Sequence, residues 1–258
     1  MGRVRNTKTP KEKFGFSLNR AILNERDFDH MKLSDNTRNI LKNFSQINQS
    51  LLFKQGTVLR TVTEEKTLYG EATIAEEIPR DFAVHDLQQL LSALSMFNDP
   101  TIDVREDCLY ISDGVMNLQY LYCDPETIVT PPDKKMNIPA QIAELTIDQN
   151  QYSQIKKAAA TLNSEYYWFY IEDGGIRIGV GEDGRHVLEM KPTTGTVLDN
   201  VVSAKAAFSV AQLSYIPGPY TIKVFGSPKV IVTEWVHGQL PLRYICPASL
   251  KLSKFEGA

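Results

Sequence analysis

Residues 31–48 read MKLSDNTRNILKNFSQIN, and this stretch predicts an amphipathic helix. Ser34 is a residue type that favours the N-cap, and Asp35 stands in the first turn, where a carboxylate interacts well with the helix dipole. Apolar side chains then recur at the spacing of one helical face, at Ile40, Leu41, Phe44, Ile47 and Leu51. Arg38, Lys42 and Gln46 recur at intervals of four residues on another face. The stretch therefore predicts a helix that buries one side and presents basic charge on a second.

The same order of elements occurs twice along the chain. After the first helix come strand-like runs, a second helix at about residues 86–97, and further strands as far as residue 122. The second half contains a helix at about residues 148–162, more strands, a short helix at about residues 210–215 and closing strands. Frequent strands beside few helices predict an α+β fold class, with two domains of antiparallel sheets, each covered on one face by two helices.

Prolines separate the two halves. Residues 125–139 contain Pro125, Pro131, Pro132 and Pro139 and few periodic apolar positions, so we interpret them as a stiff interdomain connector. This interpretation predicts a first domain at residues 31–124 and a second at residues 140–258. Residues 1–30 are basic and weakly periodic, and we expect a dispensable N-terminal extension that is disordered or comes from a misassigned start.

Composition and charge exclude several classes of protein. The chain has neither an apolar run of roughly 18 residues, as a membrane span needs, nor a signal-peptide pattern. Cys108, Cys123 and Cys246 share no short spacing, which indicates reduced thiols in a cytoplasmic protein. Residues 1–30 carry seven Lys/Arg against four Asp/Glu, whereas residues 31–258 carry 21 against 27. Such an acidic body binds nucleic acid only where its basic groups gather on one face.

Several stretches carry a resemblance to a known family. Residues 31–48 resemble the first helix of the sliding clamps of T-even-type bacteriophages, which are related in fold to the proliferating cell nuclear antigen. Residues 81–99, DFAVHDLQQLLSALSMFND, resemble the family's second helix, and residues 123–129 resemble its connector. Residues 217–220 match the position at which the chain leaves the fourth helix in members of the family. The resemblance is colinear over residues 31–258 and is strongest before about residue 130.

The resemblance implies a function and a set of partners. It implies a homotrimeric ring that encircles duplex DNA non-specifically, with helices lining the hole, and that has no enzyme activity, metal or cofactor. The ring would tether the replicative DNA polymerase as a processivity factor, be opened by an ATP-dependent clamp loader and serve late transcription, all in the cytoplasm of the infected bacterium. Free sheet edges, which favour pairing, fit a closed ring. The alternative is a phage structural or assembly protein whose sheets pair edge to edge without DNA.

The resemblance also assigns DNA-facing residues by position. Lys42 matches a basic position on the family's first helix, and Lys157 matches one on its third. Arg38 and Lys156 lie beside them, so we expect all four side chains to face the DNA and to contact phosphates. A solvated helix face explains the same charges without DNA. Arg38 is an addition to the family pattern.

Other positions in the second half and in the connector carry expectations of their own. Ala160 and Ser214 stand where the family pattern has basic residues, so we expect a less positive lining in the second domain. In the wider clamp superfamily the connector borders a pocket for a hydrophobic partner peptide. Ile128 and Val129 are the candidate edges of that pocket, and a plain linker is the alternative.

Catalytic and stacking interpretations are weaker than structural ones. His85 and Asp86, with Ser92 or Ser95 as the nucleophile, lack a nucleophile elbow, and Asp86 suits a helix N-cap better. The carboxylates of the second half do not form a metal-spaced set. The aromatic run around Trp168 fits a strand with alternating core and cross-strand side chains better than base stacking.

Overall fold

The computed structural model describes residues 30–132, 136–181 and 186–257, so the expected extension lies outside the described residues up to residue 29. Within these ranges the helices are α1 (Asp35–Ile47), α2 (Leu87–Leu94) and α3 (Gln149–Leu162), with 3-10 turns η1 (Pro125–Thr127) and η2 (Val210–Gln212). The first half contains strands β1 (His30–Met31), β2 (Leu51–Phe53), β3 (Gly56–Val62), β4 (Tyr69–Ile78), β5 (Phe82–Val84), β6 (Thr101–Val104), β7 (Cys108–Ser112) and β8 (Asn117–Leu121). The second half contains β9 (Gln141–Ile147), β10 (Tyr166–Glu172), β11 (Gly175–Gly181), β12 (Val187–Met190), β13 (Thr194–Val197), β14 (Val201–Ser209), β15 (Tyr220–Ser227), β16 (Val230–His237), β17 (Leu242–Pro247) and β18 (Lys254–Gly257).

Helix α1 begins at the cap that the sequence predicts, and α3 begins after Asp148, at the start of the helix that the sequence predicts. The Ser34 hydroxyl accepts a hydrogen bond from the Thr37 backbone N at 3.3 Å. Asp148 caps α3, and its side chain and that of Gln151 each accept a hydrogen bond from the other's backbone N–H. Phe44, on the apolar face of α1, is fully buried. Capping and apolar spacing together therefore fix where these two helices lie and which side they bury.

The expected helix at residues 210–215 is wrong in type and length. Only a 3-10 turn forms there, η2, and Ser209 caps it. Leu213, Tyr215 and Ile216 follow it and are all buried, so the chain leaves the helical path to place them in the core. Pro217 then prevents the helix from resuming. In the described residues, the second half therefore covers its sheets with one α-helix and one 3-10 turn instead of two helices.

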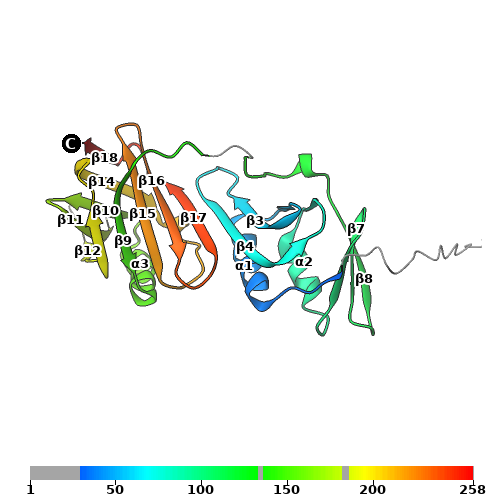
Figure 1. The fold of residues 1–258 in the computed structure, drawn as a ribbon. Coiled ribbons are helices and arrows are strands. Elements are labelled where there is room, and N and C mark those ends of the chain that lie inside the picture. The colour runs from blue at the N-terminus through cyan, green and yellow to red at the C-terminus, as the bar shows by residue number, and fades with distance from the viewer. Residues whose placement is uncertain (1–29, 133–135, 182–185, 258) are drawn as a thin grey trace, which may run out of the picture.

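One antiparallel sheet runs through both halves. Its order is β13-β9-β15-β16-β17-β4-β3, and β17 pairs with β4 from Leu242↔Ala72 to Ile245↔Tyr69. The first half adds the sheets β1-β6-β7-β8 and β2-β5, and the second half adds β12-β11-β10-β14-β18. In Figure 1 residues 122–132 and 136–140, between β8 and β9, lie along the upper side of the molecule, whereas α1 and α3 lie along its lower side. The halves are thus joined by sheet pairing as well as by the connector.

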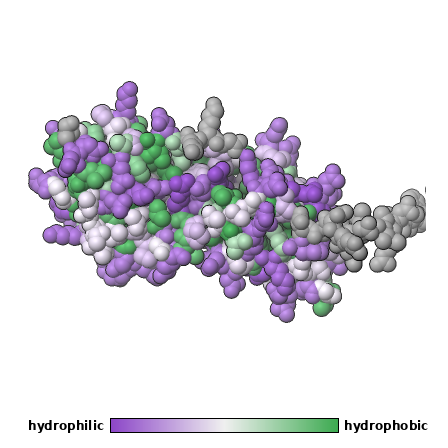
Figure 2. Space-filling view, viewed as in Figure 1, coloured by the Kyte–Doolittle hydropathy of each residue, from purple (hydrophilic) through white to green (hydrophobic). Residues whose placement is uncertain are grey.

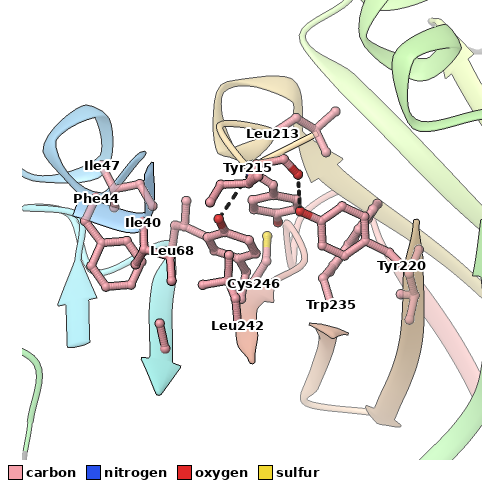
Figure 3. Close-up of a cluster of buried hydrophobic side chains, with 14 of the residues drawn as sticks. Ile40, Phe44, Ile47, Leu68, Leu213, Tyr215, Tyr220, Trp235, Leu242 and Cys246 are labelled. Carbon is pink, nitrogen blue, oxygen red and sulfur yellow. Dashed lines mark hydrogen bonds between the residues drawn. The ribbon is translucent and has the colours of Figure 1, made fainter. Parts of the chain in front are cut away.

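The hydrophobic core is continuous across this junction. Figure 3 shows Phe44 of α1 beside Leu68 and Leu242, with Tyr215 and Trp235 deeper in the second half, and all five belong to one buried cluster. Figure 2 shows polar side chains spread over both halves on the outside. None of the helices in the described residues combines the length and the apolar character that crossing a membrane requires.

Candidate nucleic-acid interface

Helices α1 and α2 border an open groove in the first half. The groove has a volume of about 560 Å³. Arg38 and Lys42 line it from α1, one turn apart, and Gln88, Ser92 and Ser95 line it from α2. The apolar face of α1 is buried elsewhere, against the sheet, so α1 presents its basic and polar side chains to the groove, together with the carboxylate of Asp35. Leu91 and Leu94 of α2 also line it.

The two basic side chains of this groove differ in how firmly they are held. The Nε of Arg38 donates a hydrogen bond to the Leu33 carbonyl oxygen at 3.2 Å, which ties the guanidinium to the start of the helix. Lys42 is exposed. Within the described residues neither side chain forms an ion pair with a carboxylate. Their positive charge is therefore available to an anion from outside the chain.

The lysines of α3 do not share one groove in this way. Lys156 and Lys157 are both exposed, and the Lys156 ammonium nitrogen lies 5.8 Å from the ring centroid of Tyr152. Lys157 instead lines a more apolar groove of about 730 Å³, together with His186 and Leu188 beside the edge strand β12. The four predicted residues thus lie in two places, with Arg38 and Lys42 together and the two lysines of α3 diverging.

The chemistry of these grooves suits binding to a phosphate backbone. Ammonium, guanidinium, amide and hydroxyl groups can donate hydrogen bonds to phosphate oxygens without reading base edges. Helix α1 is about 20 Å long at ~1.5 Å per residue, so its basic groups reach only a few phosphates. So few contacts give weak binding that salt weakens further.

The catalytic alternative fails on the placement of its residues. Asp86 is the N-cap of α2, and its Oδ1 accepts a hydrogen bond from the Gln89 backbone N at 2.8 Å. The hydroxyls of Ser92 and Ser95 donate to backbone carbonyls of α2 itself, those of Gln88 and Ser92. These groups stabilise the helix and are not arranged as a nucleophile with its base. In the part of the chain that the structure describes, no three metal-ligating side chains come together.

The chain is similar in sequence to several phage proteins of one kind. The model of the family described as DNA polymerase processivity factor matches residues 34–130. The sliding clamp of Escherichia phage RB69 is 28% identical over 215 residues, which cover 81% of this chain and 94% of that clamp. This chain is similar to that phage sliding clamp over most of its length. The sliding clamp of Enterobacteria phage T4 is 32% identical over 57% of this chain and 65% of its own length, and that of Vibrio phage KVP40 is 32% identical over 51% and 61%.

Solved structures show the same fold at low identity. The proliferating cell nuclear antigen of Entamoeba histolytica has a TM-score of 0.63 at 11% identity, covering 86% of this chain and 98% of its own. That of Thermococcus kodakaraensis has a TM-score of 0.63 at 13% identity, covering 85% and 99%. That of A. fulgidus, solved with the C-terminal region of FEN-1 bound, has a TM-score of 0.60 at 14% identity, covering 86% and 98%. The predicted α+β clamp fold is therefore confirmed.

The connector of this chain is hydrogen-bonded to the end of α1. The side-chain amide of Asn48 donates to the Val129 carbonyl oxygen at 3.2 Å and to the Val62 carbonyl oxygen at 2.8 Å. Ile128 and Val129 are both half-buried. A groove of about 270 Å³ lies beside the connector, where Pro131 faces Leu52, Lys54, Gln55, Val58 and Arg60. The partner-peptide pocket at Ile128 and Val129 stays a prediction.

The sequence does not predict which strands form two of the free sheet edges. Strand β8 ends one outer sheet and β12 ends the other, and each pairs on one side only among the described residues. Leu121 on β8 is 65% exposed and Leu188 on β12 is 40% exposed, so each edge also presents an apolar side chain. The sequence signals free edges in general, but it does not say which strands are last in their sheets.

Proposed function

We propose that this chain works as a DNA sliding clamp, in which three copies close into a ring round duplex DNA and hold the replicative polymerase on its template. The observation that carries the proposal is the groove between α1 and α2. Helix α1 buries Phe44 and leaves Arg38 and Lys42 in an open groove, without carboxylate partners among the described residues. The sliding clamps of RB69 and T4 support the same function.

In this proposal Arg38, Lys42, Lys156 and Lys157 face the DNA and contact phosphates. The contacts are few and sensitive to salt, so the ring is retained because it is closed round the duplex and not because it binds tightly. The body outside the grooves is acidic, which limits sticking to DNA elsewhere on the surface. Weak contact and topological retention together allow sliding.

Ring closure in this proposal uses the edges at β8 and β12. Two different edges that pair head to tail give a heterologous contact, and such contacts end when a ring closes. Residues 31–124 and 140–258 are the two clamp domains of each subunit, joined by the connector at 125–139. Three subunits of 29.1 kDa then make the ring.

The partners of the proposed ring follow from its role. The polymerase docks by a peptide at the connector near Ile128 and Val129, as a C-terminal region of FEN-1 is bound to the A. fulgidus relative. An ATP-dependent clamp loader opens the ring, the late transcription machinery uses it, and all of this takes place in the cytoplasm of the infected bacterium. The chain itself is proposed to catalyse no reaction.

Retention on DNA of different topology tests the proposal. The protein is loaded on nicked circular DNA with its loader and ATP, freed of unbound protein by gel filtration, and half of the sample is then cut once. The proposal predicts that the protein stays on the circles and leaves the linear molecules, and that it has the mass of a trimer. Equal retention on both forms, or a monomer at micromolar concentration, contradicts it. An assembly protein without a DNA role would not be retained on either form.

A further inference from the structure

Asn43 is a buried polar residue in the helix that carries the basic groove. It directly follows Lys42 in α1 and is 7% exposed. Its side-chain Nδ2 donates to the Ser214 carbonyl oxygen at 2.6 Å, and its Oδ1 accepts from the Tyr244 hydroxyl at 2.7 Å. Both partners belong to the second half of the chain. The amide therefore links the first helix of one half to the core of the other.

The partners of Asn43 are themselves held firmly. Tyr244 is fully buried, and its ring stacks on Tyr215 with centroids 4.3 Å apart and an angle of 15° between the planes. Its hydroxyl also accepts a hydrogen bond from the Ile216 backbone N at 3.2 Å. Because the Ser214 carbonyl can only accept, the Nδ2 of Asn43 must face it, which fixes the orientation of the amide. The second half thus offers α1 one fixed donor and one fixed acceptor.

This link restricts the rotation of α1 about its own axis more closely than the apolar contacts do. Apolar burial is non-directional, so it sets which face of the helix packs against the sheet but tolerates small rotations about the helix axis. Hydrogen bonds from a buried amide are directional. Neighbouring residues on a helix point about 100° apart, so fixing Asn43 toward the second half fixes Lys42 toward the groove. Arg38, one turn earlier, shares the direction of Lys42.

An apolar pair would fill the same space without this directional control. Replacing both partners of a buried hydrogen bond by apolar groups of the same shape is nearly neutral for stability. The gain from Asn43 and Tyr244 is therefore chiefly orientation. Other contacts join the two sheets, among them the β17–β4 pairing and the hydrogen bonds of Arg243 to Glu71 at 2.6 and 3.0 Å, and these involve no residue of α1. Hydrogen bonds from Thr37 to Glu76 and from Asn48 to Val62 hold the two ends of α1 within the first half, whereas Asn43 links its middle to the second half.

We infer that Asn43 is a positioning residue, which uses Ser214 and Tyr244 of the second half to hold Arg38 and Lys42 in the groove of the first. The inference rests on the proposed function for the role of that groove. In this inference, residues of the second half orient the DNA-facing side chains of the first half. Loss of either hydrogen-bonding partner should let α1 rotate while the sheets stay joined.

The test compares three variants that each remove one buried polar group. Tyr244→Phe removes the hydroxyl that donates to Asn43, and Asn43→Ala removes the amide. Tyr220→Phe is the matched control, because Tyr220 is 1% exposed and its hydroxyl donates to the Ile216 carbonyl oxygen, within the second half alone. Thermal unfolding shows whether all three fold.

Pulsed electron paramagnetic resonance then measures the position of α1 without DNA. Nitroxides are placed at the exposed Asn39 of α1 and Gln154 of α3. Cys123 is half-buried and is replaced by alanine so that it takes no label, whereas Cys108 and Cys246 are buried and are kept. The labelled subunits are diluted with unlabelled ones. Tyr244→Phe and Asn43→Ala should broaden and shift the distance distribution, and Tyr220→Phe should match the parent. A parent-like distribution in Tyr244→Phe or Asn43→Ala, or equal broadening in Tyr220→Phe, overturns the inference.

A DNA measurement on the same variants separates this inference from the proposed function. Tyr244→Phe should shorten the half-life on circular DNA at raised salt, and Tyr220→Phe should leave it unchanged. An equal loss of half-life in both variants would contradict positioning. A parent protein that is not retained on circles would contradict the proposed function, while the distance distributions would still decide the role of Asn43.

Discussion

The two halves of this chain present their basic side chains in different ways. In the first half Arg38 and Lys42 stand one turn apart on α1 and line a single groove against α2. In the second half Lys156 and Lys157 are sequence neighbours, so they point about 100° apart on α3. Only Lys157 lines the groove next to β12, and the turn η2 stands where a second helix would complete a counterpart of the first groove.

The difference shows that spacing, more than the number of charges, decides whether basic groups converge. A pair at i and i+4 shares one side of a helix, whereas adjacent residues do not. We therefore expect the first half to contribute more of the contact with DNA. The second half contributes a fixed frame for α1 and a sheet edge for assembly.

The largest expected effect comes from the core that joins the halves. Phe44→Ala should lower the free energy of unfolding by about 3–5 kcal/mol, because its side chain is fully buried. Ile155→Ala, on the buried face of α3, should lower it by about 2–5 kcal/mol for the same reason. Urea unfolding followed by tryptophan fluorescence measures both, at one fixed protein concentration. Trp168 and Trp235, the two tryptophans of the chain, lie in the second half. If Phe44→Ala leaves their transition unmoved, the halves unfold separately and the shared core does not couple them.

Acid should weaken the second half through His237. Its Nδ1 accepts hydrogen bonds from the backbone N–H groups of Gln239 and Leu240, each at 3.1 Å, and burial lowers the pKa of His237. Above an ordinary pKa of about 6.5 the residue is neutral in both states, and its contribution is complete. As the pH falls below that value the unfolded chain binds a proton that the native state resists. Stability then declines by up to about 1.4 kcal/mol per pH unit until the native pKa is reached.

The pH dependence of the urea midpoint checks this expectation. His237→Gln should flatten the decline below about pH 6.5, the ordinary histidine pKa. His85→Gln is the control, because His85 is exposed, and it should keep the parental slope. An unchanged slope in His237→Gln would show that other groups cause the acid sensitivity.

Removing the N-cap of α1 or α3 should lower the free energy of unfolding by less than the core substitutions do, and by different amounts for the two helices. Removing an N-cap costs about 0.5–2 kcal/mol. Asp148→Ala should cost more than Ser34→Ala, because Asp148 accepts at 2.7 Å within a reciprocal capping box, whereas Ser34 accepts at 3.3 Å. Urea unfolding of the two variants gives the difference, and a larger loss for Ser34→Ala would contradict this ranking.

The smallest effect on stability is expected from the exposed lysines. Lys42→Glu combined with Lys157→Glu should change the free energy of unfolding by no more than about 0.5 kcal/mol and leave the trimer intact. It should weaken processive synthesis, most clearly at raised salt, where the remaining attraction is screened. Lys229→Glu, in the exposed turn between β15 and β16, is the charge-matched control. A double variant that supports the polymerase as well as the parent across a salt series would remove these lysines from the DNA path.

Local signals in the sequence account for much of the fold. The cap at Ser34 and the apolar spacing that includes Phe44 predict α1, and apolar spacing predicts α3, because these signals act within a few residues. The same reasoning fails at residues 210–215, where the side chains fit a helical pattern. There the chain leaves the helical conformation, and Leu213 and Tyr215 are buried in the core. The pairing of β17 with β4 is a long-range register that local patterns do not specify.

Local signals in the sequence also predict one part of the candidate site, and only the tertiary structure shows the rest. The i and i+4 spacing of Arg38 and Lys42 predicts their shared face, whereas their groove depends on the packing of α2 against α1. Asn43 looks like one more polar residue of an amphipathic helix. Its partner Tyr244 lies 201 residues away, so only the tertiary structure shows that the amide is buried and paired.

Photocrosslinking tests most directly the claim that DNA runs along the helical side. A photoreactive amino acid is placed at Gln46 in the α1–α2 groove, at Gln154 on α3, or at Thr221 on the sheet, and each protein is loaded on circular DNA. Thr221 is half-buried and precedes Lys223 by two positions on β15, so both share the sheet face opposite the buried Ile222. The account predicts crosslinks to DNA from Gln46, fewer from Gln154, and none above background from Thr221. Crosslinks that are strongest from Thr221, or equal from all three, would contradict it.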